Sequence, residues 1–143
     1  MSTLVDLQLP LAAPPQQVMA TLLAHTQLSR FFSAQFELVR EAKVGQPRGG
    51  VGAVRQVTTM GNTFNEEVLH ADDALLSYCI VGEGPLVDHL GEIRLTPTAT
   101  GCQLHYRIKG RSATWVPTWL VALVLRRQIA AAMHKLQEHF HAD

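Results

Sequence analysis

The first third of the chain changes from alternating to helical spacing of its hydrophobic residues. Alternation over residues 4–11 predicts a first β-strand. Proline at a helix start, followed by apolar residues three and four positions apart, predicts a helix over residues 14–25. A second short helix follows over residues 26–32, with Thr26 as its N-cap. The chain therefore opens with one strand and two short helices.

The spacing then changes to a period of two, which indicates strands with one buried face. Glycine, proline, asparagine and aspartate residues typical of turns separate the successive strand-like segments. The segments cover residues 36–45, 52–60, 63–71, 75–83, 87–97 and 102–110. Because the connections between them are short, we expect an antiparallel sheet of hairpins.

The last segment has the pattern of one long amphipathic helix, from about Pro117 to about His139. Its apolar residues recur at steps of three and four: Ala122, Leu125, Ile129, Met133, Leu136 and Phe140. The order of elements predicts an α+β fold in which a curved antiparallel sheet of about seven strands wraps round this C-terminal helix. A single helix does not fill such a concave sheet, so we expect an internal cavity between the two.

Length and charge limit the classes of function. The 143 residues are enough for a single domain over 1–143. The formal net charge of zero provides no basic surface for nucleic acid. Asp6 interrupts the first apolar run, which argues against a signal peptide, and cytoplasmic is the default location. The longest apolar stretch, residues 115–125, is too short for a transmembrane segment.

The hairpins predict which side chains face the cavity, because directly opposed residues share a face. A turn over residues 60–63 would pair Met60 with Thr63 and place Arg55 diagonally across from Glu66. The pairs expected in the later hairpins are Glu66–Ile80 and Val68–Tyr78, then Ile80–Gly91 and Tyr78–Ile93, then Ile93–Tyr106 and Leu95–Leu104. The resulting inner face holds Arg55, Val57, Phe64, Glu66, Val68, Tyr78, Ile80, His89, Gly91, Ile93, Leu95, Cys102, Leu104, Tyr106 and Ile108.

Five polar residues lie on this otherwise apolar face: Arg55, Glu66, Tyr78, His89 and Tyr106. A dry core tolerates arginine and glutamate only when they are paired. One interpretation is a structural Arg55–Glu66 ion pair with His89 as a satisfied core histidine. The other is a cavity partly filled by water or ligand, which explains all five together. As a set, they favour the ligand-facing interpretation.

Three short motifs carry a resemblance to a known family. They are a Gly-x-Gly-x-x-Arg element ending at Arg55, a Glu-x-Val element at Glu66, and a turn at Pro85. With the stretches around them, they resemble the helix-grip superfamily that includes START lipid-transfer domains and pollen-allergen-like proteins. More narrowly, the chain resembles the bacterial polyketide cyclase/dehydrase (SRPBCC) family. The resemblance implies a helix-grip fold and a cavity for an apolar or amphipathic molecule.

The main hypothesis is therefore a module that binds or carries a lipid, quinone or polyketide-like molecule, with no cofactor and no metal. The expected ligand-binding residues are Arg55, Val57, Phe64, Glu66, Val68, Tyr78, Ile80, His89, Ile93, Leu104, Tyr106, Ile108 and Trp119. The resemblance leaves the ligand open, because relatives differ in what they bind and many have no assigned activity.

The alternative is an enzyme that cyclises or dehydrates its ligand. His89 is the candidate general acid or base, since an ordinary histidine titrates near neutrality. Glu66 would orient it or act as base, and Arg55 would polarise a carbonyl. The chain contains no nucleophile elbow or cofactor fingerprint. Catalysis is thus permitted by the residues and not required by them.

An apolar cluster surrounds the start of the last helix, between Trp115 and Val124. We favour an entrance to the cavity for this cluster. A homodimer or partner-protein contact is the second option, since exposed apolar patches often mark interfaces. Transient contact with a membrane is the third. The partner-protein option corresponds to a third function, that of a protein-interaction module.

Overall fold

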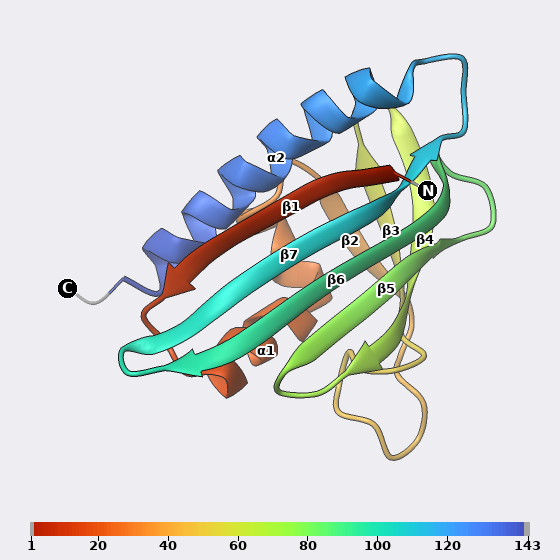
Figure 1. Cartoon of the computed structure of the whole chain (residues 1–143). Coiled ribbons are helices and arrows are strands. Elements are labelled where there is room, and N and C mark those ends of the chain that lie inside the picture. Colours follow the sequence, from red (N-terminus) through yellow and green to blue (C-terminus); the bar gives the residue numbers. More distant parts are fainter. Residues whose placement is uncertain (1, 142–143) are drawn as a thin grey trace.

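The computed structural model describes residues 2–141 and confirms the expected α+β helix-grip fold (Figure 1). The elements in chain order are β1 (Ser2–Leu11), α1 (Pro15–Leu23), the 3₁₀ helix η1 (His25–Arg30), β2 (Gln35–Arg40), β3 (Val54–Thr59), β4 (Asn62–Ala71), β5 (Leu75–Val81), β6 (Leu86–Thr98), β7 (Gly101–Ser112) and α2 (Thr118–His139). Both short helices follow the first strand, as expected.

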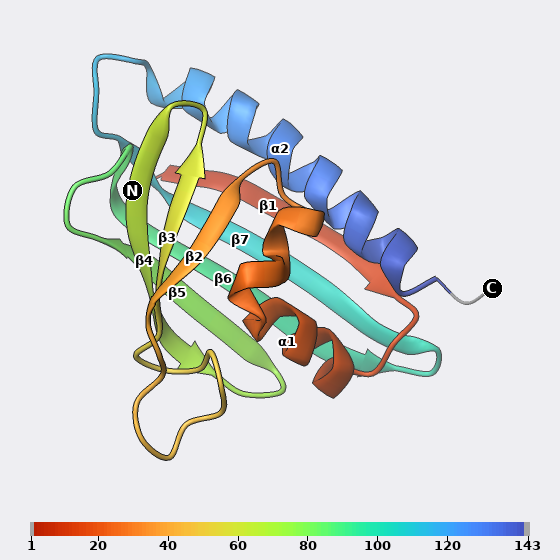
Figure 2. The same cartoon turned by 180° about the vertical axis from the view of Figure 1, so that it is seen from behind.

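All seven strands form one antiparallel sheet in the order β1-β7-β6-β5-β4-β3-β2. Helix α2 runs alongside β1 (Figure 1), and α1 lies across the inner face of the sheet when the molecule is seen from behind (Figure 2). The strands β6 and β7 are the longest of the sheet. The inner face of the sheet is therefore bounded by α2 on one side and by α1 with η1 on another.

The core forms where these helices meet the sheet. The apolar stripe of α2 is buried at Ala122, Ile129, Met133 and Leu136, as its spacing predicted. In α1, Val18 and two other apolar side chains are buried in the same cluster. Burial of this apolar surface is the main favourable term in folding.

The first hairpin turn differs from its expected position by one residue at each end. Its two central residues are Met60 and Gly61, both with positive φ (50° and 78°), and Thr59 pairs with Asn62. Two consecutive positive φ angles are the geometry of the tight turn that matches the twist of a hairpin, and glycine tolerates it best. The expected pairing of Met60 with Thr63 is therefore wrong.

This correction shifts the pairing by two residues and leaves the faces unchanged, because strand side chains alternate with a period of two. Arg55 lies directly opposite Glu66, where a diagonal placement was expected. In the β5–β6 hairpin, likewise, Tyr78 pairs with Gly91 and not with Ile93. The other expected pairs, Val68–Tyr78, Glu66–Ile80, Ile93–Tyr106 and Leu95–Leu104, are confirmed.

Two local expectations fail in the irregular parts of the chain. The expected strand over 36–45 ends at Arg40, because Glu41 folds the following loop back through hydrogen bonds from the backbone N–H groups of Ala42 and Gly49. Thr26 is not an N-cap, since η1 begins at His25 and has no side-chain cap. Loops held by such specific side-chain contacts have no periodic signature.

Candidate functional site

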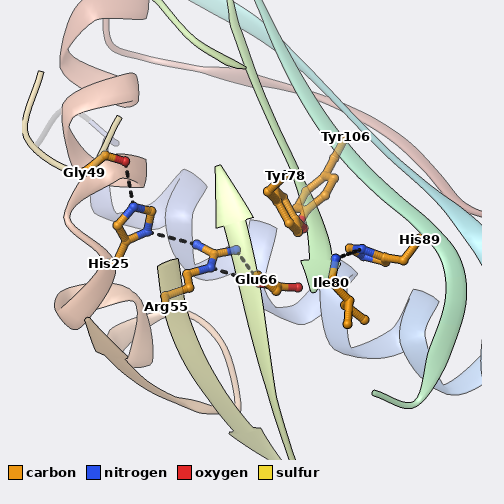
Figure 3. Close-up of polar contacts among 8 residues, drawn as sticks. All are labelled: His25, Gly49, Arg55, Glu66, Tyr78, Ile80, His89 and Tyr106. Carbon is orange, nitrogen blue, oxygen red and sulfur yellow. Dashed lines mark hydrogen bonds and ion pairs between the residues drawn. The ribbon is translucent and has the colours of Figure 1, made fainter. Parts of the chain in front are cut away.

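A cavity of about 450 Å³ lies between the inner face of the sheet and α2. Strands β3 to β7 contribute one wall, and the first half of α2 contributes the other. The segment between η1 and β2 adds Phe32 and its neighbours. Most lining side chains are apolar, and a small group of polar side chains gathers on the sheet wall (Figure 3).

The centre of this polar group is a buried ion pair between Arg55 and Glu66. Arg55 Nε donates to Glu66 Oε1 at 2.9 Å, and Nη2 forms an ion pair with the same oxygen at 2.8 Å. Both residues are nearly inaccessible to solvent, at 6% and 7% exposure. Burial alone would lower the pKa of Arg55, but the facing carboxylate more than offsets this effect and the pKa is raised.

The remaining surfaces of Arg55 are also occupied. Its guanidinium lies over the ring of Tyr78 on one side and within cation–π distance of the Phe36 ring, at 4.7 and 5.2 Å from the centroids. Its Nη1 contacts His25 Nδ1 at 3.2 Å. All three nitrogens of Arg55 therefore have protein partners.

His25 is a member of the cluster that the sequence did not reveal. Its Nε2 donates to the carbonyl oxygen of Gly49 at 2.8 Å, which leaves Nδ1 unprotonated to accept from Arg55 (Figure 3). Burial and the nearby arginine charge lower the pKa of His25 to about 4. The imidazole is thus neutral at physiological pH and links η1, the 41–53 loop and the sheet.

Two tyrosines form the next part of the polar wall. The hydroxyl groups of Tyr78 and Tyr106 hydrogen-bond to each other, and both side chains line the cavity. Burial raises the pKa of Tyr78 well above its usual value and that of Tyr106 to about 12. Both phenols are therefore protonated at neutral pH. Because one O–H is used within the pair, one O–H of the two remains available to a ligand.

His89 lies where β6 separates from β5. The paired ladder of these strands ends at Tyr78 and Gly91, so the N–H of Ile80 has no backbone partner on β6. His89 Nδ1 accepts this N–H at 3.1 Å (Figure 3). The strand irregularity beside it includes Asp88, which has a positive φ of 53°. Burial lowers the pKa of His89, so the neutral ring is favoured.

The structure brings most of the expected site residues to the cavity. Nine of them line it: Arg55, Val57, Phe64, Glu66, Tyr78, Ile80, His89, Tyr106 and Ile108. Three others, Val68, Ile93 and Leu104, lie in the packed core instead. Trp119 does not line the cavity, and its side chain is 68% exposed. Strand periodicity identifies a face, but it does not show how far along the strand the covering helices fill the space.

Several lining residues could not be inferred from the strand pattern. Helix α2 contributes Leu120, Val121 and Val124, which lie outside its predicted apolar stripe, together with Leu125 from the stripe. Phe36 faces the cavity from β2. Among residues 2–141, no group of three or more histidine, cysteine, aspartate or glutamate side chains is arranged to hold a metal ion.

The model of the family described as "Polyketide cyclase / dehydrase and lipid transport" matches residues 3–141. The chain belongs to this family. The resemblance that the motifs around Arg55, Glu66 and Pro85 suggested is thereby confirmed. No curated protein matches the sequence.

Solved structures show how widely the fold of this polyketide cyclase/dehydrase family member is shared. A START superfamily protein from Mycobacterium smegmatis has a TM-score of 0.77 and 12% identity, with 95% of each chain covered. The protein XoxI from Bacillus cereus has a TM-score of 0.71 and 15% identity, over 98% of this chain and 96% of that one. Ara h 8.0201 has a TM-score of 0.67 and 16% identity, with 97% of each chain covered. At these identities the likeness supports the fold alone.

Within residues 2–141, no helix is both long and apolar enough to span a lipid bilayer.

Proposed function

We propose that this protein binds a small apolar or amphipathic molecule, such as a lipid, a quinone or a polyketide-like compound, in the cavity between the sheet and α2. The observation that carries the proposal is the cavity itself, about 450 Å³ in volume and lined mainly by apolar side chains. Ligand pockets of proteins are typically clefts of this size with a few convergent polar groups. Membership of a family described partly by lipid transport supports the same conclusion.

The enzymatic alternative receives less support from the geometry. A general base needs a free lone pair within reach of the ligand. The lone pair of His89 Nδ1 accepts the N–H of Ile80, and each nitrogen of Arg55 contacts a protein partner. Glu66 is held as the counterion of Arg55 through Oε1, so its Oε2 is the one candidate lone pair among these three groups. A binding or carrying role uses the same groups without requiring any of them to react.

The test is to fill the cavity from α2. Val124 lines the cavity, whereas its neighbour Leu123 does not and is 39% exposed. We expect Val124→Trp to weaken binding of the neutral fluorescent probe N-phenyl-1-naphthylamine by more than about tenfold, because the indole would occupy the ligand volume. Leu123→Trp is the matched control, and it should bind the probe like the natural protein. Fluorescence titration measures both, with circular dichroism to verify folding.

The proposal fails if the natural protein does not bind the probe, or if Val124→Trp and Leu123→Trp bind it equally well. Native mass spectrometry of the purified protein complements the titration. A co-purified small molecule that Val124→Trp excludes would support the proposal and show which compound to study.

A further inference from the structure

The protonation state of His89 determines what it offers to a ligand. A neutral imidazole has one N–H and one unprotonated nitrogen. Because the N–H of Ile80 donates to Nδ1, the proton of the neutral ring is on Nε2. Within residues 2–141, Nε2 has no hydrogen-bond partner, and the side chain lines the cavity. His89 therefore presents a fixed N–H donor to the cavity.

The other polar groups of the cavity wall offer a further hydrogen-bond donor and one acceptor. The tyrosine pair retains one O–H that its members do not use between themselves. Glu66 accepts both contacts from Arg55 at Oε1, and its Oε2 has no hydrogen-bond partner in the described part of the chain. The wall thus combines N–H and O–H donors with one carboxylate oxygen.

Among residues 2–141, no free positive charge faces this wall. Apart from His89, Arg55 is the one basic side chain among the described residues that line the cavity. Its charge is matched by Glu66, and aromatic rings cover its guanidinium. A carboxylate ligand would lose its hydration here without gaining a counterion, and it would lie near the Glu66 carboxylate. An ammonium ligand would also lose its hydration, beside a carboxylate that Arg55 already neutralises. Burial of an unpaired charge carries a large cost.

We propose that the cavity selects an uncharged apolar molecule with a carbonyl oxygen, and that His89 Nε2–H is the donor that binds this oxygen. The inference rests on the proposed binding function and adds the chemical class of the ligand. It gives His89 a positioning role toward the ligand in place of acid–base chemistry. The hydrogen bond from the Ile80 N–H to Nδ1 fixes this role, because it keeps the neutral ring in the tautomer that is protonated at Nε2.

A set of naphthalenes with one substituent changed at a time tests the ligand class. The probes are 2-acetylnaphthalene, 2-ethylnaphthalene, 2-naphthoate and 2-naphthylmethylammonium, titrated into the natural protein by calorimetry at pH 7.5. We expect the ketone to bind most tightly, and the two ions to bind at least about tenfold more weakly than the ketone. Binding of either ion as tightly as the ketone would overturn the proposal.

Substitution of His89 tests the donor. We expect His89→Leu to weaken binding of 2-acetylnaphthalene by about five- to tenfold, the usual effect of one lost hydrogen bond, and to leave 2-ethylnaphthalene within about twofold. His89→Gln keeps an N–H donor at a similar reach and should restore most of the affinity for the ketone. The ratio of the two affinities within each variant removes any general effect on folding. Equal weakening of both probes by His89→Leu would overturn the assignment.

The outcomes separate this inference from the proposed function. Absence of N-phenyl-1-naphthylamine binding, or binding that Val124→Trp does not affect, contradicts the cavity function itself. Cavity-dependent binding of that probe, together with equal affinity for 2-naphthoate and 2-acetylnaphthalene, contradicts the ligand class alone.

Discussion

At the scale of single residues, the Arg55–Glu66 pair shows how a charged group is accommodated in an apolar wall. The two side chains are directly opposed on β3 and β4, and the guanidinium makes one hydrogen bond and one further ion-pair contact to the same carboxylate oxygen. Removing one partner of a buried pair leaves an uncompensated charge, and this costs more than replacing both. The pair is therefore expected to respond very differently to single and double substitution.

We expect Glu66→Gln to lower the free energy of unfolding by about 3–5 kcal/mol, because Arg55 would remain buried without its counterion. Arg55→Met combined with Glu66→Gln should recover most of this loss. Urea denaturation followed by circular dichroism measures Glu66→Gln, Arg55→Met and the double variant. If the effects of the two single substitutions simply add in the double variant, the pair is not coupled as the structure indicates.

At the scale of elements, the β5–β6 hairpin positions Tyr78, one of the two tyrosines on the sheet wall of the cavity. Gly91 lies opposite Tyr78, and a Cβ at this position would lie 2.4 Å from Tyr78 Cζ. The absence of a side chain at Gly91 therefore leaves the space that the Tyr78 ring occupies against β6. From that position the ring contacts both Arg55 and the Tyr106 hydroxyl. One glycine in β6 thus positions a cavity residue on the neighbouring strand.

Gly91→Ala is expected to lower the free energy of unfolding by about 1–3 kcal/mol, since the new methyl group would overlap the Tyr78 ring. The same substitution in a Tyr78→Leu background should cost much less, because the ring is then absent. A double-mutant cycle by urea denaturation gives the coupling between the two sites. An equal cost of Gly91→Ala in both backgrounds would show that the ring is not the cause.

At the scale of the whole molecule, His25 connects parts of the chain that are distant in sequence. It begins η1, donates to Gly49 in the 41–53 loop, and accepts from Arg55 on β3. The same ring therefore supports the helical segment, the loop and the sheet. Because the ring is buried as a neutral group, protonation is tied to loss of the folded state.

The pKa of His25 predicts how stability depends on pH. Its pKa is about 4 in the folded protein and about 6.5 in an unfolded chain. Between these values the unfolded chain binds more protons, so the free energy of unfolding falls as the pH decreases from about 6.5 to about 4. The expected loss is about 3 kcal/mol.

His25→Gln should reduce this pH dependence, as measured by urea denaturation at several pH values between 4 and 7. Some dependence should remain, because burial also lowers the pKa of His89. His134→Gln is the control, since the His134 side chain is 70% exposed on α2. An unchanged pH dependence in His25→Gln would contradict the buried neutral ring.

Some of the site residues were predictable from the strand pattern alone. The faces of Arg55, Glu66, Tyr78 and Tyr106 were inferred correctly although two hairpin registers were displaced by two residues. A displacement of two residues preserves the face, because the side-chain period of a strand is also two. His25 was not predictable, since it lies outside the strands and reaches Arg55 only after the chain folds back.

The sequence by itself determined the order of elements, the buried faces of the strands and of α2, and the family resemblance. These properties depend on the local period of hydrophobic residues and on short motifs. Only the tertiary structure decided which inner residues line the cavity, which tautomer His89 adopts, and that Trp119 is exposed and does not line the cavity. The physical reason is that these properties depend on where α1 and α2 fill the concave sheet and where β6 leaves β5. Contacts between segments distant in sequence determine both the helix positions and the point where β6 leaves β5, and no local sequence pattern predicts such contacts.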